Sequence, residues 1–192
     1  MMKRILVLII IGIAVLSACN QQKESEKKEI IVYGDYKCPY CKEVEEKVMP
    51  KLKKEYIVTD KAEFKFINMA FLGRDSIKGS RAGHAVKNIA PSQYLDFQKS
   101  MFGSQPNNKR EWITNKLLDK KIDGLDISKE KASKIKKDYK TKDSQSWKDA
   151  QEDIKEYKDN DIKQAPTVFV DKQKIEDPYK YSEYEQALKN NN

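Results

Sequence analysis

Two cysteines lie three positions apart in the segment Gly34-Asp35-Tyr36-Lys37-Cys38-Pro39-Tyr40-Cys41, which follows an apolar run and opens a run able to form a helix. Positions i and i+3 share one face of a helix, so the sulfurs of Cys38 and Cys41 can form a disulfide. At a helix N-terminus, unpaired N–H groups and the positive end of the helix dipole favour a thiolate at Cys38. Pro39 suits the first helical turn, where its missing N–H is not needed. The spacing therefore predicts a reversible two-electron redox pair.

A structural role explains the pair less well. A disulfide stabilises mainly by restricting the unfolded chain, and a bridge from Cys38 to Cys41 encloses almost no chain. A zinc site needs four ligands, and apart from carboxylates the sequence beyond its N-terminal segment adds only His84. We expect His84 to be a surface or packing residue, and the site to hold no metal and no other cofactor. Copper binding by the same thiols is the alternative from a different functional class, although no third soft ligand lies nearby in the sequence.

The first residues have the composition of a bacterial export signal. A basic start precedes the apolar run from Ile5 to Leu16, which is too short to span a bilayer as a mature helix. The run closes on Leu16-Ser17-Ala18-Cys19, which resembles the lipobox of bacterial lipoproteins. We therefore expect a signal peptide over residues 1–18, lipidation of Cys19, a lipidated tether over residues 19–28, and a location on the extracytoplasmic face of the cell membrane. Ordinary cleavage that leaves the Cys19 thiol free is the alternative.

The charge of the chain does not indicate nucleic-acid binding. The chain carries 38 Lys and Arg residues against 30 Asp and Glu residues, a formal net charge of +8. The two signs are interleaved along the sequence rather than segregated, which is typical of a solvated protein surface. We therefore assign no nucleic-acid partner, and expect the membrane, reached through the lipid anchor, to be the neighbouring surface.

The elements around the dithiol alternate between strand and helix. Residues 30–33 form a continuous apolar run, as expected for a strand buried on both faces of a sheet, and residues 62–68 alternate as a second strand does. The helix between these strands starts after Cys38 and should kink at Pro50. Two strands joined by a helix predict a right-handed, parallel βαβ unit.

A long helical segment interrupts this alternation. No strand pattern occurs from Asp75 to Asp159, and apolar residues recur there at helical spacing. We expect three stripes to form a helical core: Trp112, Ile113, Leu117 and Leu118; Ile135 and Tyr139; and Trp147, Ala150, Ile154 and Tyr157.

Strand patterns return near the C-terminus. Residues 167–170 predict a strand that turns into a short antiparallel partner at residues 174–175, and a last helix is expected over residues 182–189. Ala165-Pro166 stands directly before the returning strand, and an X-Pro bond is the peptide bond that adopts the cis form at low cost. The sequence alone leaves the isomer open.

With these features in place, the sequence from about Ile30 to Leu188 resembles the DsbA-type thiol:disulfide oxidoreductases of the thioredoxin superfamily. The resemblance rests on the run from Val32 to Cys41, on Phe71-Leu72-Gly73, on the run from Asp138 to Ser144 and on the order of elements. It implies an α/β protein with a thioredoxin fold and a large inserted helical domain. The thioredoxin-like domain would then comprise residues 29–74 and 160–192, and the inserted domain residues 75–159.

The resemblance also implies roles for the site residues. Cys38 would be the exposed attacking sulfur, Cys41 the resolving sulfur, and Pro166 a cis-proline that faces them, with Pro39, Tyr40 and Ala165 as neighbours. Tyr40 stands where relatives from Gram-negative bacteria have histidine, so it supplies no positive charge. Ala165 stands where many relatives have threonine or valine, which removes a possible hydroxyl contact.

The activity that the resemblance implies is donation of the Cys38–Cys41 disulfide to reduced exported proteins, with an unidentified partner that re-oxidises the dithiol. A membrane-tethered reductase or isomerase is the alternative within the same fold. A copper-binding or chaperone-like lipoprotein is the alternative from another class.

Overall fold

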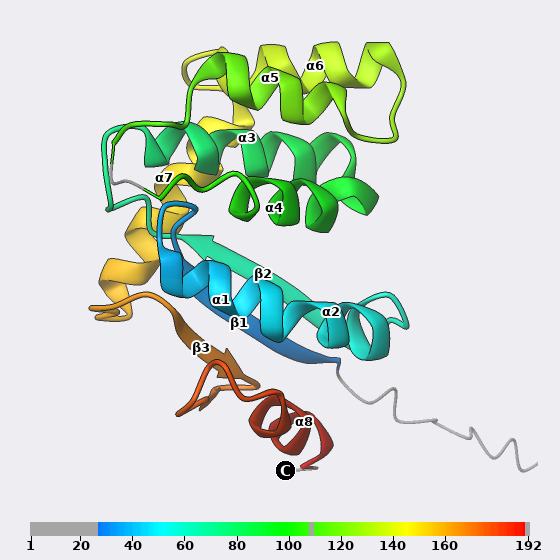
Figure 1. Ribbon diagram of the computed structural model, residues 1–192, viewed down its shortest axis with the longest axis vertical. Coiled ribbons are helices and arrows are strands. Elements are labelled where there is room, and N and C mark those ends of the chain that lie inside the picture. The colour runs from blue at the N-terminus through cyan, green and yellow to red at the C-terminus, as the bar shows by residue number, and fades with distance from the viewer. Residues whose placement is uncertain (1–26, 108–109, 191–192) are drawn as a thin grey trace, which may run out of the picture.

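The computed structural model describes residues 27–107 and 110–190. The expected signal peptide, Cys19 and the tether up to residue 26 lie outside the described residues. Within the described ones, a sheet of four strands carries helices on both faces, and a block of helices stands at one end of the sheet (Figure 1). No helix in this part of the chain is long and apolar enough to cross a membrane.

The sheet has the strand order β2-β1-β3-β4. β1 (Lys28–Gly34) pairs in parallel with β2 (Ala62–Asn68). β1 also pairs antiparallel with β3 (Thr167–Val170), which forms a hairpin with β4 (Gln173–Lys174). These pairings confirm the predicted parallel β-helix-β unit and the terminal hairpin, and β4 begins one residue earlier than predicted.

The expectation that the tether continues to residue 28 is wrong. Lys28 is the first residue of β1 and pairs with Ala62 of β2. Its ammonium group also donates to the carbonyl oxygen of Ala187 at 3.1 Å. Lys27 forms an ion pair with Asp60, with Nζ and Oδ2 2.7 Å apart. β1 therefore begins at Lys28, inside the expected tether, because backbone pairing and these contacts hold the two polar lysines at the sheet.

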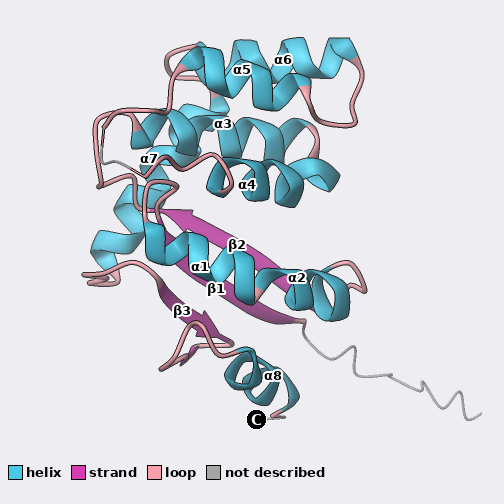
Figure 2. Ribbon diagram, in the orientation of Figure 1, coloured by secondary structure: helices cyan, strands magenta, loops and turns pink. Residues whose placement is uncertain are grey.

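Helices occupy most of the remaining described chain. They are α1 (Pro39–Lys47), α2 (Met49–Leu52), α3 (Ser76–Ile89), α4 (Tyr94–Phe102), α5 (Asn115–Asp123), α6 (Lys129–Lys140), α7 (Gln145–Asp159) and α8 (Tyr181–Lys189), with a π-helical turn at Lys53–Ile57 and a 3₁₀ turn at Pro91–Gln93. α3 to α6 form the block at the end of the sheet, and α7 runs from this block to pack on β2 (Figure 2).

The helix that follows the dithiol is interrupted close to the predicted position. α1 ends at Lys47, and Val48, with φ −111° and ψ −47°, separates it from α2. Pro50 lies in the first turn of α2. Because proline has no N–H and its ring clashes with the preceding turn, α1 cannot continue through it.

One predicted apolar stripe crosses the start of a helix. Its later part lies in α5, but Trp112 and Ile113 precede that helix. Thr114 caps α5, because its hydroxyl accepts the N–H of Leu117 at 3.2 Å. The N–H groups of Trp112 and Ile113 donate instead to the buried carboxylate of Asp75, at 2.8 and 2.9 Å. The helical spacing of these two residues is therefore misleading, because a side-chain acceptor takes their backbone donors.

Both faces of β1 are covered, as predicted for a buried strand. Ile30 and Val32 belong to the large core that includes residues of α1, α4 and α8. On the other face, Ile31 and Tyr33 pack in a smaller cluster with Tyr157 of α7. The end of β1, where the dithiol turn begins, is thus held from two sides.

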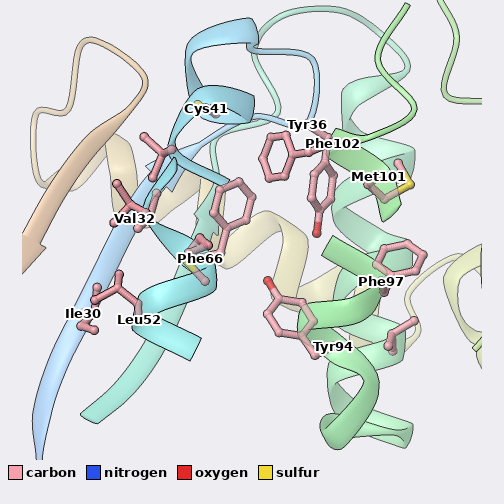
Figure 3. Close-up of a cluster of buried hydrophobic side chains, with 14 of the residues drawn as sticks. Ile30, Val32, Tyr36, Cys41, Leu52, Phe66, Tyr94, Phe97, Met101 and Phe102 are labelled. Atoms are coloured by element: carbon pink, nitrogen blue, oxygen red, sulfur yellow. The ribbon is translucent and has the colours of Figure 1, made fainter. Parts of the chain in front are cut away.

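An aromatic cluster joins the dithiol turn to β2 and to the helical block. The ring of Tyr36 stacks on that of Phe66 with centroids 5.4 Å apart, and meets the rings of Phe97 and Phe102 edge-on (Figure 3). Gly34 must be glycine here, since a Cβ would lie 2.6 Å from the ring of Phe66. The dithiol turn is therefore packed, through Tyr36, against the rings of β2 and α4.

Candidate active site

The two cysteines stand where β1 passes into α1. Cys38 is the N-cap residue of α1, and its Sγ accepts the N–H of Cys41 at 3.3 Å. The N–H of Cys38 donates to the carbonyl oxygen of Asp35 at 2.9 Å. Both cysteines are free thiols, and Cys41 is buried one turn inside the helix. The structure confirms the predicted helix N-terminus at Cys38.

The two thiols have opposite electrostatic environments. A hydrogen bond from the thiol of Cys41, with the backbone N–H groups of Cys41 and Tyr40, lowers the pKa of Cys38 against the opposing effects of burial and the Asp35 charge. Burial raises the pKa of Cys41 well above that of an ordinary thiol, and its hydrogen bond with Cys38 adds to the increase. Cys38 is therefore suited to be a thiolate, while Cys41 keeps its proton.

The expectation of an exposed Cys38 sulfur is wrong, because the residue is only 3% exposed. The chain before β3 covers it: the carbonyl oxygen of Ala165 lies 3.5 Å from Sγ and accepts the thiol hydrogen. The Ala165–Pro166 peptide bond is cis. The side chain of Ala165 offers no hydroxyl, and its backbone carbonyl makes the polar contact instead. A group that attacks the Cys38 sulfur must displace this contact.

A cavity of about 430 Å³ lies beside Ala165, the residue whose carbonyl oxygen covers the sulfur. Tyr40 from α1, Ala165 and Pro166 from the chain before β3, and Tyr179 from the chain before α8 line it. Tyr40 is 61% exposed, and Pro39 beside it is exposed as well. The structure thus brings the expected neighbours Tyr40 and Ala165 to one cavity wall together with Pro166, and leaves Pro39 in the first turn of α1.

Asp35 is an acceptor hub that no sequence pattern singles out. Its fully buried carboxylate accepts the N–H of Lys37 at 2.8 Å and the hydroxyl of Ser76 at 3.0 Å. It also accepts the N–H groups of Phe71 and Leu72, at 2.9 and 3.0 Å. Burial raises the pKa of Asp35, and the four hydrogen bonds oppose that increase. The one feature of the sequence that sets Asp35 apart is a charged residue directly after a buried strand, and this feature does not indicate which donors it binds.

The helical block reaches the same turn through Gln105. The side-chain amide of Gln105 donates to the carbonyl oxygens of Tyr36 and Cys38, at 2.7 and 3.0 Å. Lys37 forms a second link, a buried ion pair with Asp75 in which Nζ and Oδ1 are 2.5 Å apart. No periodicity or motif marks Gln105, which lies 67 residues from Cys38 in the sequence.

His84 lies away from the dithiol and has a packing role, as expected. Its Nε2 is 2.8 Å from Oδ2 of Asp153 on α7. The same carboxylate oxygen accepts the N–H of Asn68 at the end of β2, so the pair ties α3 and α7 to the sheet. Among the residues that the structure describes, no group of three or more His, Cys, Asp or Glu side chains could hold a metal ion.

Comparison with known proteins identifies similar chains. A family model described as thioredoxin matches residues 23–190. The probable disulfide bond formation protein D of Bacillus anthracis is 33% identical over 189 residues, covering 86% of this chain and 83% of that protein. The oxidised crystal structure of BdbD from Bacillus subtilis has a TM-score of 0.75 at 26% identity, covering 87% of this chain and 90% of that one.

A more distant solved structure, DsbA of Chlamydia trachomatis, has a TM-score of 0.65 at 18% identity and covers 84% of each chain. At that identity the likeness shows the fold alone. Together these findings confirm the α/β thioredoxin fold with an inserted helical domain. The domain boundaries at residues 29–74, 75–159 and 160–192 stay a prediction.

Proposed function

The chain belongs to the thioredoxin family, as a DsbA-type thiol:disulfide oxidoreductase, and we propose that it works as a dithiol oxidase outside the cytoplasm. In this role the Cys38–Cys41 disulfide is donated to reduced exported proteins. A separate partner, whose identity is open, then re-oxidises the dithiol. The enzyme needs no cofactor for this exchange, because both electrons are carried by the two sulfurs.

The observation that carries the proposal is the contrast between the two thiols. Cys38 accepts N–H groups at a helix N-terminus and has a lowered pKa, whereas burial raises the pKa of Cys41. A sulfur whose thiolate is stabilised is a good leaving group, so a disulfide that includes Cys38 is readily given away. The reduced enzyme is the favoured product, which makes the oxidised enzyme an oxidant.

The exchange proceeds in two displacements. A substrate thiolate attacks Sγ of Cys38, the bond between Cys38 and Cys41 breaks, and the Cys41 sulfur departs with the electron pair and takes up a proton. A second substrate thiolate then attacks the substrate sulfur of the mixed disulfide and expels Cys38 as a thiolate. The substrate loses two electrons and the enzyme gains them.

We also propose that the residues next to the dithiol bind a segment of the substrate. The carbonyl oxygen of Ala165 contacts the Cys38 sulfur, and Pro166 and Tyr40 line the cavity that Ala165 also lines. We propose that a segment of the substrate enters there and displaces the contact between the Ala165 carbonyl and Cys38. Pro39 sets the backbone of the first helical turn and touches no reacting atom in this scheme.

The anchor is proposed from the sequence. Cys19 closes a lipobox-like segment, and the first described residue, Lys27, lies directly before β1. Lipidation of Cys19 would hold the domain near the outer surface of the membrane. Replacing Cys19 with serine is expected to move the protein from the membrane fraction to the medium, and a variant that stays membrane-bound would remove the anchor from the proposal.

The equilibrium potential of the dithiol tests the direction of the reaction. Purified protein is equilibrated with defined ratios of reduced and oxidised glutathione, and the oxidised fraction is measured. We expect a couple more oxidising than glutathione itself. A strongly reducing couple would favour the reductase or isomerase alternative, and a dithiol that fails to exchange would favour the copper-binding or chaperone-like one.

A further inference from the structure

The proposed lipid anchor would limit how far the domain can move from the membrane, but it does not decide which face of the domain points there. Lys27, the first described residue, follows Cys19 by eight positions. A fully extended chain spans at most about 3.6 Å per residue, so Lys27 would lie within about 30 Å of the anchored residue. β1 starts at Lys28, and the end of the sheet where it starts is therefore attached most closely to the anchor.

A basic turn lies beside the start of β1. This turn, residues 51–61, leads from the end of α2 through the π-helical turn to the start of β2 (Figure 1). Ala62, the first residue of β2, pairs with Lys28, so the basic turn ends next to the start of β1. The basic turn contains four lysines, Lys51, Lys53, Lys54 and Lys61, against the two acidic residues Glu55 and Asp60.

Both acidic side chains of the basic turn already have partners. The carboxylate of Asp60 forms an ion pair with Lys27, with Oδ2 and Nζ 2.7 Å apart. The carboxylate of Glu55 accepts the hydroxyl of Tyr181, the first residue of α8, at 2.5 Å. The negative charges are thus turned toward neighbouring elements, which leaves the lysines to set the charge of the outer surface.

Three of the four lysines have no carboxylate partner. Lys53 forms an ion pair with Asp96 of α4, with Nζ and Oδ1 2.5 Å apart. The other three, Lys51, Lys54 and Lys61, are exposed and form no ion pair within residues 27–107 and 110–190. The outer surface of the basic turn therefore carries three cations that can meet the charges of a partner.

Val58 supplies an apolar tip to the same turn. Its side chain is 63% exposed. The backbone around it is fixed, because the N–H of Val58 donates to the carbonyl oxygen of Lys53 at 2.9 Å and the N–H of Lys61 to that of Tyr56 at 2.8 Å. An exposed apolar residue among lysines suits the boundary between headgroups and acyl chains, where apolar groups enter the bilayer and the ammonium groups stay at the phosphates.

The dithiol end of the sheet is the competing membrane face, because Phe71 and Leu72 are 45% and 41% exposed there. The cations near these residues already have partners. Lys37 forms a buried ion pair with Asp75, and Arg74 forms an ion pair with Glu111 at 3.2 Å. The dithiol end thus offers apolar area without unpaired cations, and an anionic surface fits the basic turn better.

We propose that the basic turn contacts a bilayer that contains anionic phospholipids, with its three unpaired lysines at the headgroup phosphates and Val58 at the acyl boundary. This inference rests on the proposed function, because only the anchored enzyme is held at a membrane. The anchor retains the domain and the basic turn orients it. The seven residues of β1 then place the dithiol turn about 20 Å further from the bilayer, on the side from which exported proteins approach.

Tryptophan fluorescence identifies the end that meets the lipid. The chain from residue 19, carrying Cys19→Ser so that no lipid chain contributes, is mixed with vesicles of phosphatidylcholine containing about one third phosphatidylglycerol. Val58→Trp and Leu72→Trp place a reporter at opposite ends of β2, and the spectrum of the protein without a reporter is subtracted. We expect the emission of Val58→Trp to shift by several nanometres to shorter wavelength, and that of Leu72→Trp to stay unchanged.

Neutralising the lysines tests the charge of the basic turn. Lys51→Gln, Lys54→Gln and Lys61→Gln together should weaken vesicle binding at least about tenfold, since each lysine close to an anionic surface contributes about fivefold. The matched control combines Lys116→Gln, Lys120→Gln and Lys134→Gln, at exposed positions of α5 and α6. It changes the net charge by the same amount and should weaken binding less than about threefold.

Salt provides a further check, because the Debye length falls from about 30 Å at 0.01 M to about 3 Å at 1 M, and binding should be lost over this range. A protein that does not bind the anionic vesicles at low salt overturns the inference. So does a shift at Leu72→Trp without one at Val58→Trp, or a control triple variant that binds as weakly as the variant of the basic turn. Failure of the proposed function is detected separately, by the equilibrium with glutathione and by the fractionation of Cys19→Ser cells.

Discussion

The turn that carries Cys38 and the pocket that holds Cys41 act on their thiols by different means. At Cys38 the stabilising groups are local, since the thiol of Cys41 and the N–H groups of Cys41 and Tyr40 come from the same helical turn. At Cys41 the deciding factor is burial, which depends on β2, α4 and other elements far away in the sequence. The comparison teaches that a short motif can prepare a thiolate, whereas a buried proton requires the assembled fold.

The largest loss of stability is expected when Asp35, whose carboxylate holds the dithiol turn, is replaced. Asp35→Ala removes a carboxylate that accepts four hydrogen bonds, and leaves donors of Lys37, Phe71, Leu72 and Ser76 without their partner. Because each buried unpaired donor costs about 1–3 kcal/mol, we expect a loss of at least about 3 kcal/mol in the free energy of unfolding. Urea denaturation measures it. Asp96→Ala, at an exposed site, serves as control, and a loss at Asp35 no larger than at Asp96 would show that the turn does not depend on this hub.

The second effect is the difference in stability between reduced and oxidised protein. If the fold stabilises the Cys38 thiolate, the reduced form must unfold at higher urea concentration than the oxidised form. For a two-electron couple, about 30 mV corresponds to about 1.4 kcal/mol. We expect a gain of roughly 2–3 kcal/mol, because Tyr40 adds no positive charge and the helix dipole supplies only about 0.3–2 kcal/mol. An oxidised form that is clearly more stable would contradict the oxidase assignment.

This difference should depend on pH on both sides of the unfolded thiol pKa, because the two thiol pKa values shift in opposite directions. The folded pKa of Cys38 is lowered, so its contribution to the reduced form is complete above the unfolded thiol pKa of about 8.5 and is lost as pH falls through the folded pKa. The folded pKa of Cys41 is raised, so its contribution is complete below about 8.5 and is lost as pH rises. The excess stability of the reduced form should therefore peak near pH 8.5, with slopes of up to about 1.4 kcal/mol per pH unit. A stability difference that does not rise with pH below about 8.5 would contradict the lowered pKa of Cys38, and one that does not fall above about 8.5 would contradict the raised pKa of Cys41.

The third effect concerns the link from the helical block. Gln105→Leu removes two hydrogen bonds to the carbonyl oxygens of Tyr36 and Cys38 and leaves both acceptors with fewer partners. We expect a loss of about 1–3 kcal/mol in the free energy of unfolding. Gln145→Leu removes an exposed hydrogen bond to Asp149 and should change stability by less than about 0.5 kcal/mol. Equal effects from the two substitutions would mean that Gln105 does not support the turn.

The sequence predicts the dithiol turn better than it predicts the residues that pack around the turn. The dithiol, its helix N-terminus and the strand before it follow from local spacing, and the proline before β3 follows from a strand pattern. Gln105 and Gln98 carry no such signal, because their contacts arise when α4 and the chain after it pack against the dithiol turn and α1. The sequence also does not predict that the Ala165 carbonyl oxygen covers the Cys38 sulfur, because this oxygen is a backbone group whose position depends on the assembled sheet.

The smallest effect is expected from charge at the exposed position between the cysteines. Tyr40→His introduces a side chain that is protonated below about pH 6.5, next to a sulfur whose thiolate is already stabilised by the Cys41 thiol and by backbone N–H groups. Tyr40 is 61% exposed, so water and salt screen an imidazolium at this position, and an exposed charge pair contributes only about 0.2–1 kcal/mol. Since about 1.4 kcal/mol corresponds to one pKa unit, the pKa of Cys38 should fall by less than about one unit.

Thiolate absorbance at 240 nm as a function of pH, measured in variants that also carry Cys41→Ala, reports this directly. Tyr40→Gln has no charge and should leave the pKa of Cys38 close to that of the Tyr40 protein. A shift with histidine that exceeds about one unit would mean that charge at this position acts through a less screened path than its exposure implies, and the local backbone would then have a smaller share in preparing the thiolate than the geometry of the turn indicates.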